Sequence, residues 1–120
     1  MSFSENLFRK NTQIDSSEFF GYIRTLVADV KKVTTPLHIF VFGSVARNTP
    51  TLNSDLDILI ILSDRDCLSE VRSLFYKSKT LLGIEADIVF QNESQFHSSD
   101  NIFNGIIKSE LKEVYPSWCL

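Results

Sequence analysis

The stretch Leu-Asp-Ile-Leu-Ile-Ile-Leu at positions 56–62 restricts the possible folds more than any other part of the sequence. All of its residues except Asp57 are apolar, so a strand formed here has apolar side chains on both faces. Such a strand needs cover on both sides, whereas a strand with one wet face alternates apolar and polar residues. The run is much shorter than the about 18 apolar residues of a membrane-spanning helix. We therefore expect the central strand of a sheet, with chain packed against both of its faces.

Three segments repeat apolar residues at intervals of three or four and are predicted to be helices. The first begins at a capping-box spacing from Asp15 and stops before Pro36, the second begins at Ser63, and the third is capped by Ser99. Their apolar stripes are Phe19, Ile23, Leu26, Val27 and Val30; Leu68, Val71, Leu74, Phe75 and Leu82; and Ile102, Phe103, Ile106, Ile107 and Leu111, ended by Pro116. The polar residues expected on or near the outer side of the first helix are Arg24, Asp29, Lys31 and Lys32.

Two further strands are expected beside the central one. Residues 38–42 are β-branched and aromatic, and residues 84–90 form a similar run. The link 43–54 is rich in turn residues and is predicted to hold one short helical turn at 44–47. The order helix, strand, loop, strand, helix, strand, helix is typical of an α/β (α+β) fold. We expect a small mixed sheet of three strands or slightly more, flanked by helices.

Length, charge and cysteine content exclude several classes of protein. A chain of 120 residues has room for one domain, 1–120, with residues 1–14 as an N-terminal extension and a core at about 15–115. A net charge of −3 argues against a general nucleic-acid-binding protein, which would be basic. No signal peptide or membrane segment is expected. Cys67 and Cys119 are far apart and predict free thiols in the reducing cytoplasm.

The lengths of the connections predict which strand ends meet. The central strand reaches residues 84–90 through a helix, which favours a parallel, right-handed crossover. The link from residues 38–42 to the central strand holds no full helix, which favours antiparallel neighbours. The end of the first strand should then lie beside the beginnings of the other two. The segments brought together are Gly43-Ser44, Asp55-Leu56-Asp57 and Ala86-Asp87.

Three carboxylates are therefore expected at one end of the sheet. Asp55 and Asp57 are two residues apart in an extended segment, so their side chains leave the same face, and Asp87 interrupts an apolar run. Crowded carboxylates repel one another and raise one another's pKa values. Mg²⁺ bound by carboxylates and substrate phosphates relieves that repulsion. Taken singly, the Asp-x-Asp pair is common in turns, and Asp87 could be satisfied by backbone donors.

The Gly43-Ser44 pair could supply a phosphate site next to these carboxylates. Glycine at a strand end lets a ligand approach the backbone closely and accepts positive φ. The backbone N–H groups and the Ser44 hydroxyl at the start of a helical turn can hold phosphate oxygens. Arg47, one turn further on, adds a positive charge for a triphosphate. A Gly-Ser pair after a strand is often only a turn, and the single residues His38 and His97 are interpreted as structural.

Phe42-Gly43-Ser44, followed after ten residues by Asp55-Leu56-Asp57, resembles the signature of the polymerase-beta-like nucleotidyltransferase superfamily. The fuller stretches around these residues are similar to its minimal nucleotidyltransferase branch. Asp87 falls where that family has its third carboxylate, and residues 107–115 resemble its last helix. One departure is Asn48, where the family commonly has glycine; asparagine tolerates left-handed geometry, so the loop should be kept.

The resemblance implies transfer of a nucleoside monophosphate, AMP from ATP, with release of pyrophosphate. Asp55 and Asp57 would hold two Mg²⁺ ions, and Asp87 would hold the ion that activates the acceptor hydroxyl and take its proton. Ser44 would contact the β- and γ-phosphates, and Gly43 would permit their approach.

The resemblance also suggests a partner. Many family members of this length are similar to the antitoxin half of a pair with a small, all-helical, ribonuclease-like toxin, and some transfer AMP to a hydroxyl of that partner. A protein acceptor is therefore the leading hypothesis. The alternatives are a non-catalytic module that neutralises its partner by contact alone, and an aminoglycoside-type transferase acting on a small molecule. A homo-oligomer also remains open.

Overall fold

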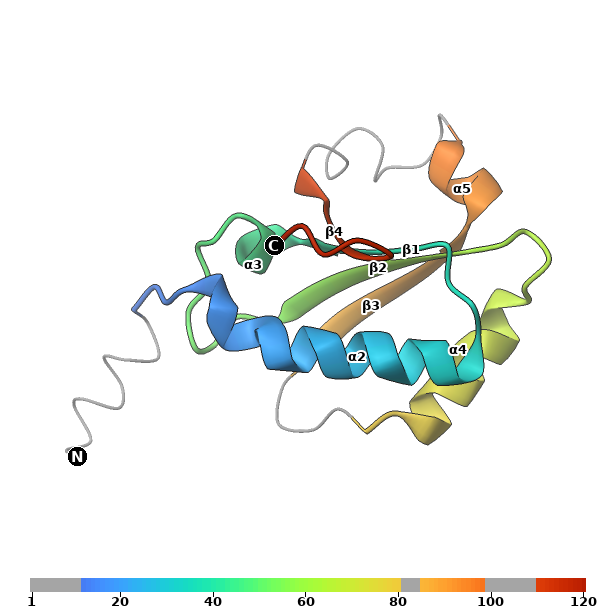
Figure 1. Cartoon of the computed structure of the whole chain (residues 1–120), viewed down its shortest axis with the longest axis horizontal. Helices are drawn as coiled ribbons and strands as arrows, with labels where there is room; N and C mark the ends of the chain where they lie inside the picture. The colour runs from blue at the N-terminus through green and yellow to red at the C-terminus, as the bar shows by residue number, and fades with distance from the viewer. Residues whose placement is uncertain (1–11, 81–84, 99–109) are drawn as a thin grey trace.

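The computed structural model describes residues 12–80, 85–98 and 110–120. Four strands form one mixed sheet in the order β3-β2-β1-β4 (Figure 1). The strands are β1 (His38–Phe42), β2 (Leu56–Leu62), β3 (Ala86–Asn92) and β4 (Lys112–Tyr115). The predicted α/β (α+β) fold with a small mixed sheet is confirmed, with one strand more than the three expected as a minimum.

Strand β2 occupies the interior of the sheet and is buried on both faces, as its apolar run predicts. Leu56, Ile58 and Ile60 lie in the larger hydrophobic cluster, while Leu59 and Ile61 lie in a second cluster on the opposite face. All five side chains are at most 1% exposed. β2 pairs antiparallel with β1 and parallel with β3, in agreement with the connection lengths.

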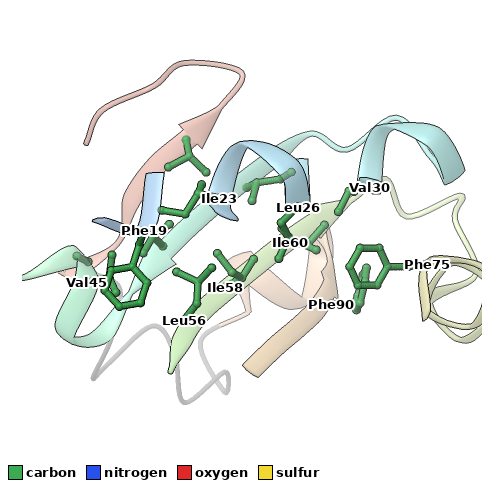
Figure 2. Packing of buried hydrophobic residues seen from close by; sticks show 14 of the residues in the cluster. Phe19, Ile23, Leu26, Val30, Val45, Leu56, Ile58, Ile60, Phe75 and Phe90 are labelled. Carbon is green, nitrogen blue, oxygen red and sulfur yellow. The ribbon is translucent and has the colours of Figure 1, made fainter. Parts of the chain in front are cut away.

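One face of the sheet is covered by helices α2 (Phe20–Val33) and α4 (Leu68–Ser78). A 3₁₀ turn, η1 (Ser16–Phe19), precedes α2, and the Asp15 side chain caps it by accepting a 2.9 Å hydrogen bond from the Ser17 N–H. Figure 2 shows the helix side chains lying over the β2 side chains. Phe75 of α4 completes this layer against Phe90, with ring centroids 5.9 Å apart. The helix residues packed over β2 are Phe19, Ile23, Leu26 and Val30.

Helix α4 begins five residues later than predicted. The Ser63 carbonyl accepts from the Asp66 N–H at 3.0 Å, and the Ser63 hydroxyl accepts from the Arg65 N–H at 3.2 Å. These bonds form a turn after β2 instead of a helix start, because serine and aspartate side chains bond to nearby backbone outside helices as readily as at their caps. Leu74, which helical spacing places on the apolar stripe, is 51% exposed, since Val71 and Phe75 define the buried side.

Asp29 is the second correction on the helical layer. We expected it on or near the outer side of the first helix, but it is 1% exposed. Its carboxylate bonds to Thr80, in the segment that follows α4. Helical periodicity alone could not predict this contact, because the partner lies 51 residues away in the sequence.

The end of the chain contains the third correction. The helix predicted from Ser99 to Pro116 falls largely on residues 99–109, outside the described residues, but residues 112–115 form strand β4. β4 pairs antiparallel with β1, and its Val114 is 5% exposed. Backbone pairing with the edge of β1 favours a strand here, a long-range effect that helical spacing does not include.

Two short helices and the end of β3 complete the described elements. α3 (Gly43–Ala46) is the short helical turn after β1, and α5 (Glu93–His97) follows β3 and packs Phe96 on the second cluster. β3 runs to Asn92, two residues past its predicted end. Both cysteines are free and exposed. Among the described residues, no helix has the length and apolar character needed to cross a membrane.

Candidate active site

The site lies at the end of the sheet where β1 finishes and β2 and β3 start (Figure 1). Asp57 lies opposite Phe42 of β1 on one side and opposite Asp87 of β3 on the other. Neighbouring strands are about 4.8 Å apart and residues in register share a face, so the Asp57 and Asp87 side chains leave the same face. Asp55 lies just before β2. The structure thus brings the three predicted carboxylates to one edge, which we call the carboxylate edge.

The pKa of Asp57 is raised at this edge. Its side chain is half-buried, whereas those of Asp55 and Asp87 are exposed. Burial raises the pKa of Asp57 above its ordinary value, the charges of Asp87 and Asp55 raise that pKa further, and Arg47 opposes them in part. The carboxylate edge therefore holds more negative charge than its own cation balances, which favours a bound cation.

Gly43 is required here for two separate steric reasons. Its φ of 73° lies in the left-handed region that favours glycine. A Cβ atom at this position would overlap Asp57 Oδ2 and lie 3.1 Å from Asp57 Cγ. The backbone of the β1–α3 junction consequently touches the carboxylate of β2, and a larger residue would displace that carboxylate.

The loop after Gly43 is held by backbone bonds and by Asn48. The Arg47 N–H donates to the Gly43 carbonyl at 3.1 Å, and the Thr49 N–H donates to the Ser44 carbonyl at 2.9 Å. Asn48 has a φ of 58°, as expected for a residue that replaces glycine in a left-handed position. Its Oδ1 also accepts a 2.9 Å bond from the Ser16 N–H, which ties the loop to η1. Asparagine therefore keeps the loop geometry and adds a contact that glycine lacks.

Arg47 projects from the end of α3 and has an acidic neighbour that the sequence did not predict. Its Nη1 lies 3.1 Å from Glu110 Oε2, and its charge also acts on Asp57. Glu110 reaches this edge because β4 pairs with β1, placing Lys112 opposite Val41. Sequence reasoning assigned residues 112–115 to a helix and so had no signal for Glu110.

The chemistry of these side chains suits a hard divalent cation, since carboxylate oxygens are the ligands that Mg²⁺ prefers. Within residues 12–80, 85–98 and 110–120, no three His, Cys, Asp or Glu side chains are grouped closely enough to hold a metal ion as they stand. The features that fit a cation at the carboxylate edge are the pairing of Asp57 with Asp87 in register and the repulsion between these carboxylates, which raises the pKa of Asp57.

Comparison with known families decides the class of the protein. The profile of the family described as "Nucleotidyltransferase domain" matches residues 23–113. The chain belongs to this family. The matched span runs through β1, α3, β2 and β3 and so contains Gly43, Ser44, Asp55, Asp57 and Asp87. The protein is therefore a nucleotidyltransferase, in agreement with the resemblance of its Gly-Ser and Asp-x-Asp motifs.

One relative supports this family, and one solved structure supports the fold. A Methanocaldococcus jannaschii protein, named as a candidate protein adenylyltransferase, is 34% identical over 64 residues, which are 53% of this chain and 69% of the relative. The crystal structure of a candidate nucleotidyltransferase from Sulfolobus solfataricus superimposes with a TM-score of 0.51 and 20% identity. That superposition covers 68% of this chain and 73% of the other, and it supports the fold.

Proposed function

We propose that this nucleotidyltransferase transfers AMP from ATP to a hydroxyl group of a protein acceptor and releases pyrophosphate. The observation that carries the proposal is the contact of the Gly43 backbone with Asp57, whose neighbour in register is Asp87. This contact places the start of α3, where backbone N–H groups and the Ser44 hydroxyl can hold phosphate oxygens, next to the carboxylates. Nucleotidyl transfer requires both features, because it depends on positioning and on neutralising phosphate charge.

The carboxylates have separate roles in this proposal. Asp55 and Asp57 would hold two Mg²⁺ ions, and Asp87 would share one of them. Bound Mg²⁺ would neutralise phosphate charge and stabilise the attacking and leaving oxygens. The acceptor oxygen forms a bond to the α-phosphorus, the bond to pyrophosphate breaks, and the exposed Asp87 takes the acceptor proton.

The β1–α3 junction receives the triphosphate. Gly43 lets the backbone pass against the Asp57 carboxylate, and the Ser44 hydroxyl at the start of α3 donates to the β- and γ-phosphates. The Arg47 guanidinium adds charge-assisted hydrogen bonds. Keeping the β- and γ-phosphates on this side presents the α-phosphorus to the carboxylate edge.

A protein is the acceptor in this proposal. The Methanocaldococcus jannaschii relative carries the name of a protein adenylyltransferase, which supports this acceptor class. Asp55 and Asp87 are exposed at the end of the sheet, where a side chain of another protein can reach them. We propose a small, all-helical, ribonuclease-like protein as the partner, with the two proteins forming a toxin–antitoxin pair.

The first experiment follows label from ATP into the proteins that co-purify with this chain. ATP labelled at the α-phosphate should label a partner in the presence of Mg²⁺, and ATP labelled at the γ-phosphate should not. EDTA and the double variant Asp55→Asn with Asp57→Asn should both abolish labelling. Asp64→Asn is the matched control, because Asp64 follows β2 at the opposite end of the sheet.

Two outcomes would contradict the proposal. Transfer that persists in the double variant would remove the carboxylates from the chemistry. Neutralisation of the partner without any labelling would favour the non-catalytic binding module. A thermal unfolding series with millimolar ATP separates these cases further, since a Mg²⁺-dependent increase in Tm shows that the nucleotide binds to the folded chain.

A further inference from the structure

Glu110 is an acidic residue at the carboxylate edge to which the proposed function gives no role. β4 runs antiparallel to β1 with Lys112 opposite Val41, so residue 110 lies at the end of the sheet where β1 stops. The Glu110 carboxylate contacts Arg47, with Oε2 3.1 Å from Nη1. The backbone register and the side-chain contact thus place Glu110 beside the triphosphate side of the site by two separate observations.

The contact between Glu110 and Arg47 contributes little to folding. The Arg47 and Glu110 side chains are 51% and 36% exposed, and ion pairs this open to water add little to stability. A carboxylate at this end of the sheet is stabilised by a cation beside it. Arg47 is that cation, so the main consequence of the contact is the orientation of the guanidinium group.

An oriented arginine has donors left for a second ligand. The guanidinium group has five N–H donors in a fixed plane, and the contact with Glu110 is made at Nη1. The backbone of Arg47 is also held, because its N–H bonds to the Gly43 carbonyl. An arginine side chain that is free to rotate loses more conformational entropy on binding phosphate than one that is already held.

We propose that Glu110 is a positioning residue of the nucleotide site. It holds the Arg47 guanidinium so that the remaining N–H groups face the β- and γ-phosphates of the incoming triphosphate. This inference rests on the proposed function, since it assumes that Arg47 binds a nucleoside triphosphate. It predicts an effect on nucleotide binding that passes through Arg47 and is absent when Arg47 is removed.

The test measures the Kd of MgATP by titration together with KM and kcat for transfer. Glu110→Ala should raise Kd and KM for MgATP about 3- to 10-fold with little change in kcat, and Glu110→Gln, which keeps an acceptor, should recover most of the loss. In an Arg47→Ala background, Glu110→Ala should have no further effect. Glu113→Ala is the matched control: Glu113 lies in the same segment but pairs with His38, Nδ1 to Oε1 2.6 Å.

Each of the other outcomes would contradict this inference, the proposed function or both. An equal increase of Kd in both backgrounds would contradict the inference, because the effect would not pass through Arg47. A decrease of Kd would also contradict it and would show that Glu110 competes with phosphate. MgATP binding with this mutational pattern but without transfer would overturn the proposed transfer activity alone, whereas absence of MgATP binding would overturn both.

Discussion

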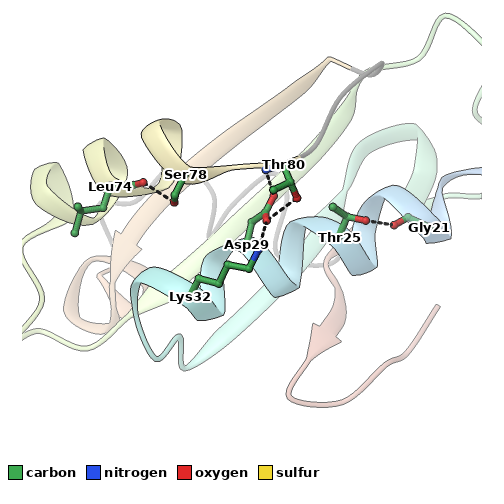
Figure 3. Close-up of polar contacts among 7 residues, drawn as sticks. All are labelled: Gly21, Thr25, Asp29, Lys32, Leu74, Ser78 and Thr80. Carbon is green, nitrogen blue, oxygen red and sulfur yellow. Dashed lines mark hydrogen bonds and ion pairs between the residues drawn. The ribbon is translucent and has the colours of Figure 1, made fainter.

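Asp29 is buried and Asp57 is half-buried, but the groups around the two carboxylates differ. The comparison shows which of them the chain itself stabilises in the charged form. Asp29 in α2 is 1% exposed and accepts hydrogen bonds from the Thr80 N–H at 2.7 Å and from the Thr80 hydroxyl at 2.9 Å (Figure 3). Lys32 Nζ lies 3.5 Å from its Oδ1. Asp57 in β2 is half-buried beside Asp87 and Asp55, with Arg47 as the opposing charge.

Burial acts in the same direction on both carboxyls, and their partners act in opposite directions. Burial raises the pKa of Asp29, but the two Thr80 bonds and the Lys32 ammonium outweigh it, so its pKa is lowered. Burial also raises the pKa of Asp57, and the neighbouring carboxylates add to that increase. The chain therefore stabilises the charge of Asp29 with its own groups, whereas the groups around Asp57 disfavour its charge, which is the pattern expected if the proposed cation binds there.

The largest expected effect comes from removing each charge in turn. Asp57→Asn should reduce nucleotidyl transfer at least about 100-fold, since it removes one of the carboxylates proposed to hold Mg²⁺. Its free energy of unfolding at neutral pH should not fall and should rise by about 0.5 kcal/mol or less, because the substitution removes a charge that its neighbours repel. Transfer assays and urea unfolding of the same preparations measure both quantities.

Asp29→Asn should give the reverse pattern. An amide cannot accept both Thr80 bonds as the carboxylate does, so unfolding should become easier by about 2 kcal/mol. Transfer measured well below Tm should stay within about twofold of the unmodified chain, because Asp29 contacts no part of the carboxylate edge. Equal losses of activity and stability in both variants would abolish the distinction between the two aspartates.

The contrast also shows how far sequence reasoning could go. The apolar run of β2, the short link before it and the long link after it predict that Gly43, Asp57 and Asp87 meet, because strand polarity follows from connection length. The contacts of Asp29 and Glu110 were missed for one shared reason. Each depends on a partner distant in the chain, Thr80 or Arg47, and local periodicity carries no information about such pairs.

The next largest effect is expected from replacing Gly43, with Gly21 as the matched control. Gly43→Ala would place a Cβ against Asp57 and force a residue with φ of 73° into a strained backbone. Transfer should fall about 10- to 100-fold, because displacing a positioned group by about 1 Å has effects of that size. Unfolding should also become easier by about 1–2 kcal/mol. Transfer assays below Tm and thermal unfolding check the two parts.

Gly21→Ala is the matched control. Gly21 lies in helix α2, and a Cβ built there meets nothing within 4 Å. The variant should be more stable by about 0.5–1 kcal/mol, because alanine favours helices more than glycine does, and its transfer rate should be unchanged. If Gly43→Ala keeps full activity, the close approach of backbone and carboxylate has no part in the chemistry.

The smallest effect is expected in the pH dependence of stability, where the two aspartates should have opposite signs. The folded-state pKa of Asp29 lies below 3.8, so its stabilising contribution is present at neutral pH and is lost as the pH falls below that value. The folded-state pKa of Asp57 lies above 3.8, so protonation of Asp57 favours the folded state. That contribution is present in acid and is lost as the pH rises through the raised pKa.

Urea unfolding from about pH 3 to about pH 7 measures these contributions as differences from the variants. The free energy of unfolding of the unmodified chain minus that of Asp29→Asn should shrink towards acid. The corresponding difference for Asp57→Asn should instead grow towards acid. Mg²⁺ at saturating concentration should flatten the Asp57 difference, because a bound cation competes with the proton, and it should leave the Asp29 difference unchanged. If both differences shrank towards acid, the charge of Asp57, like that of Asp29, would already be stabilised by the chain itself.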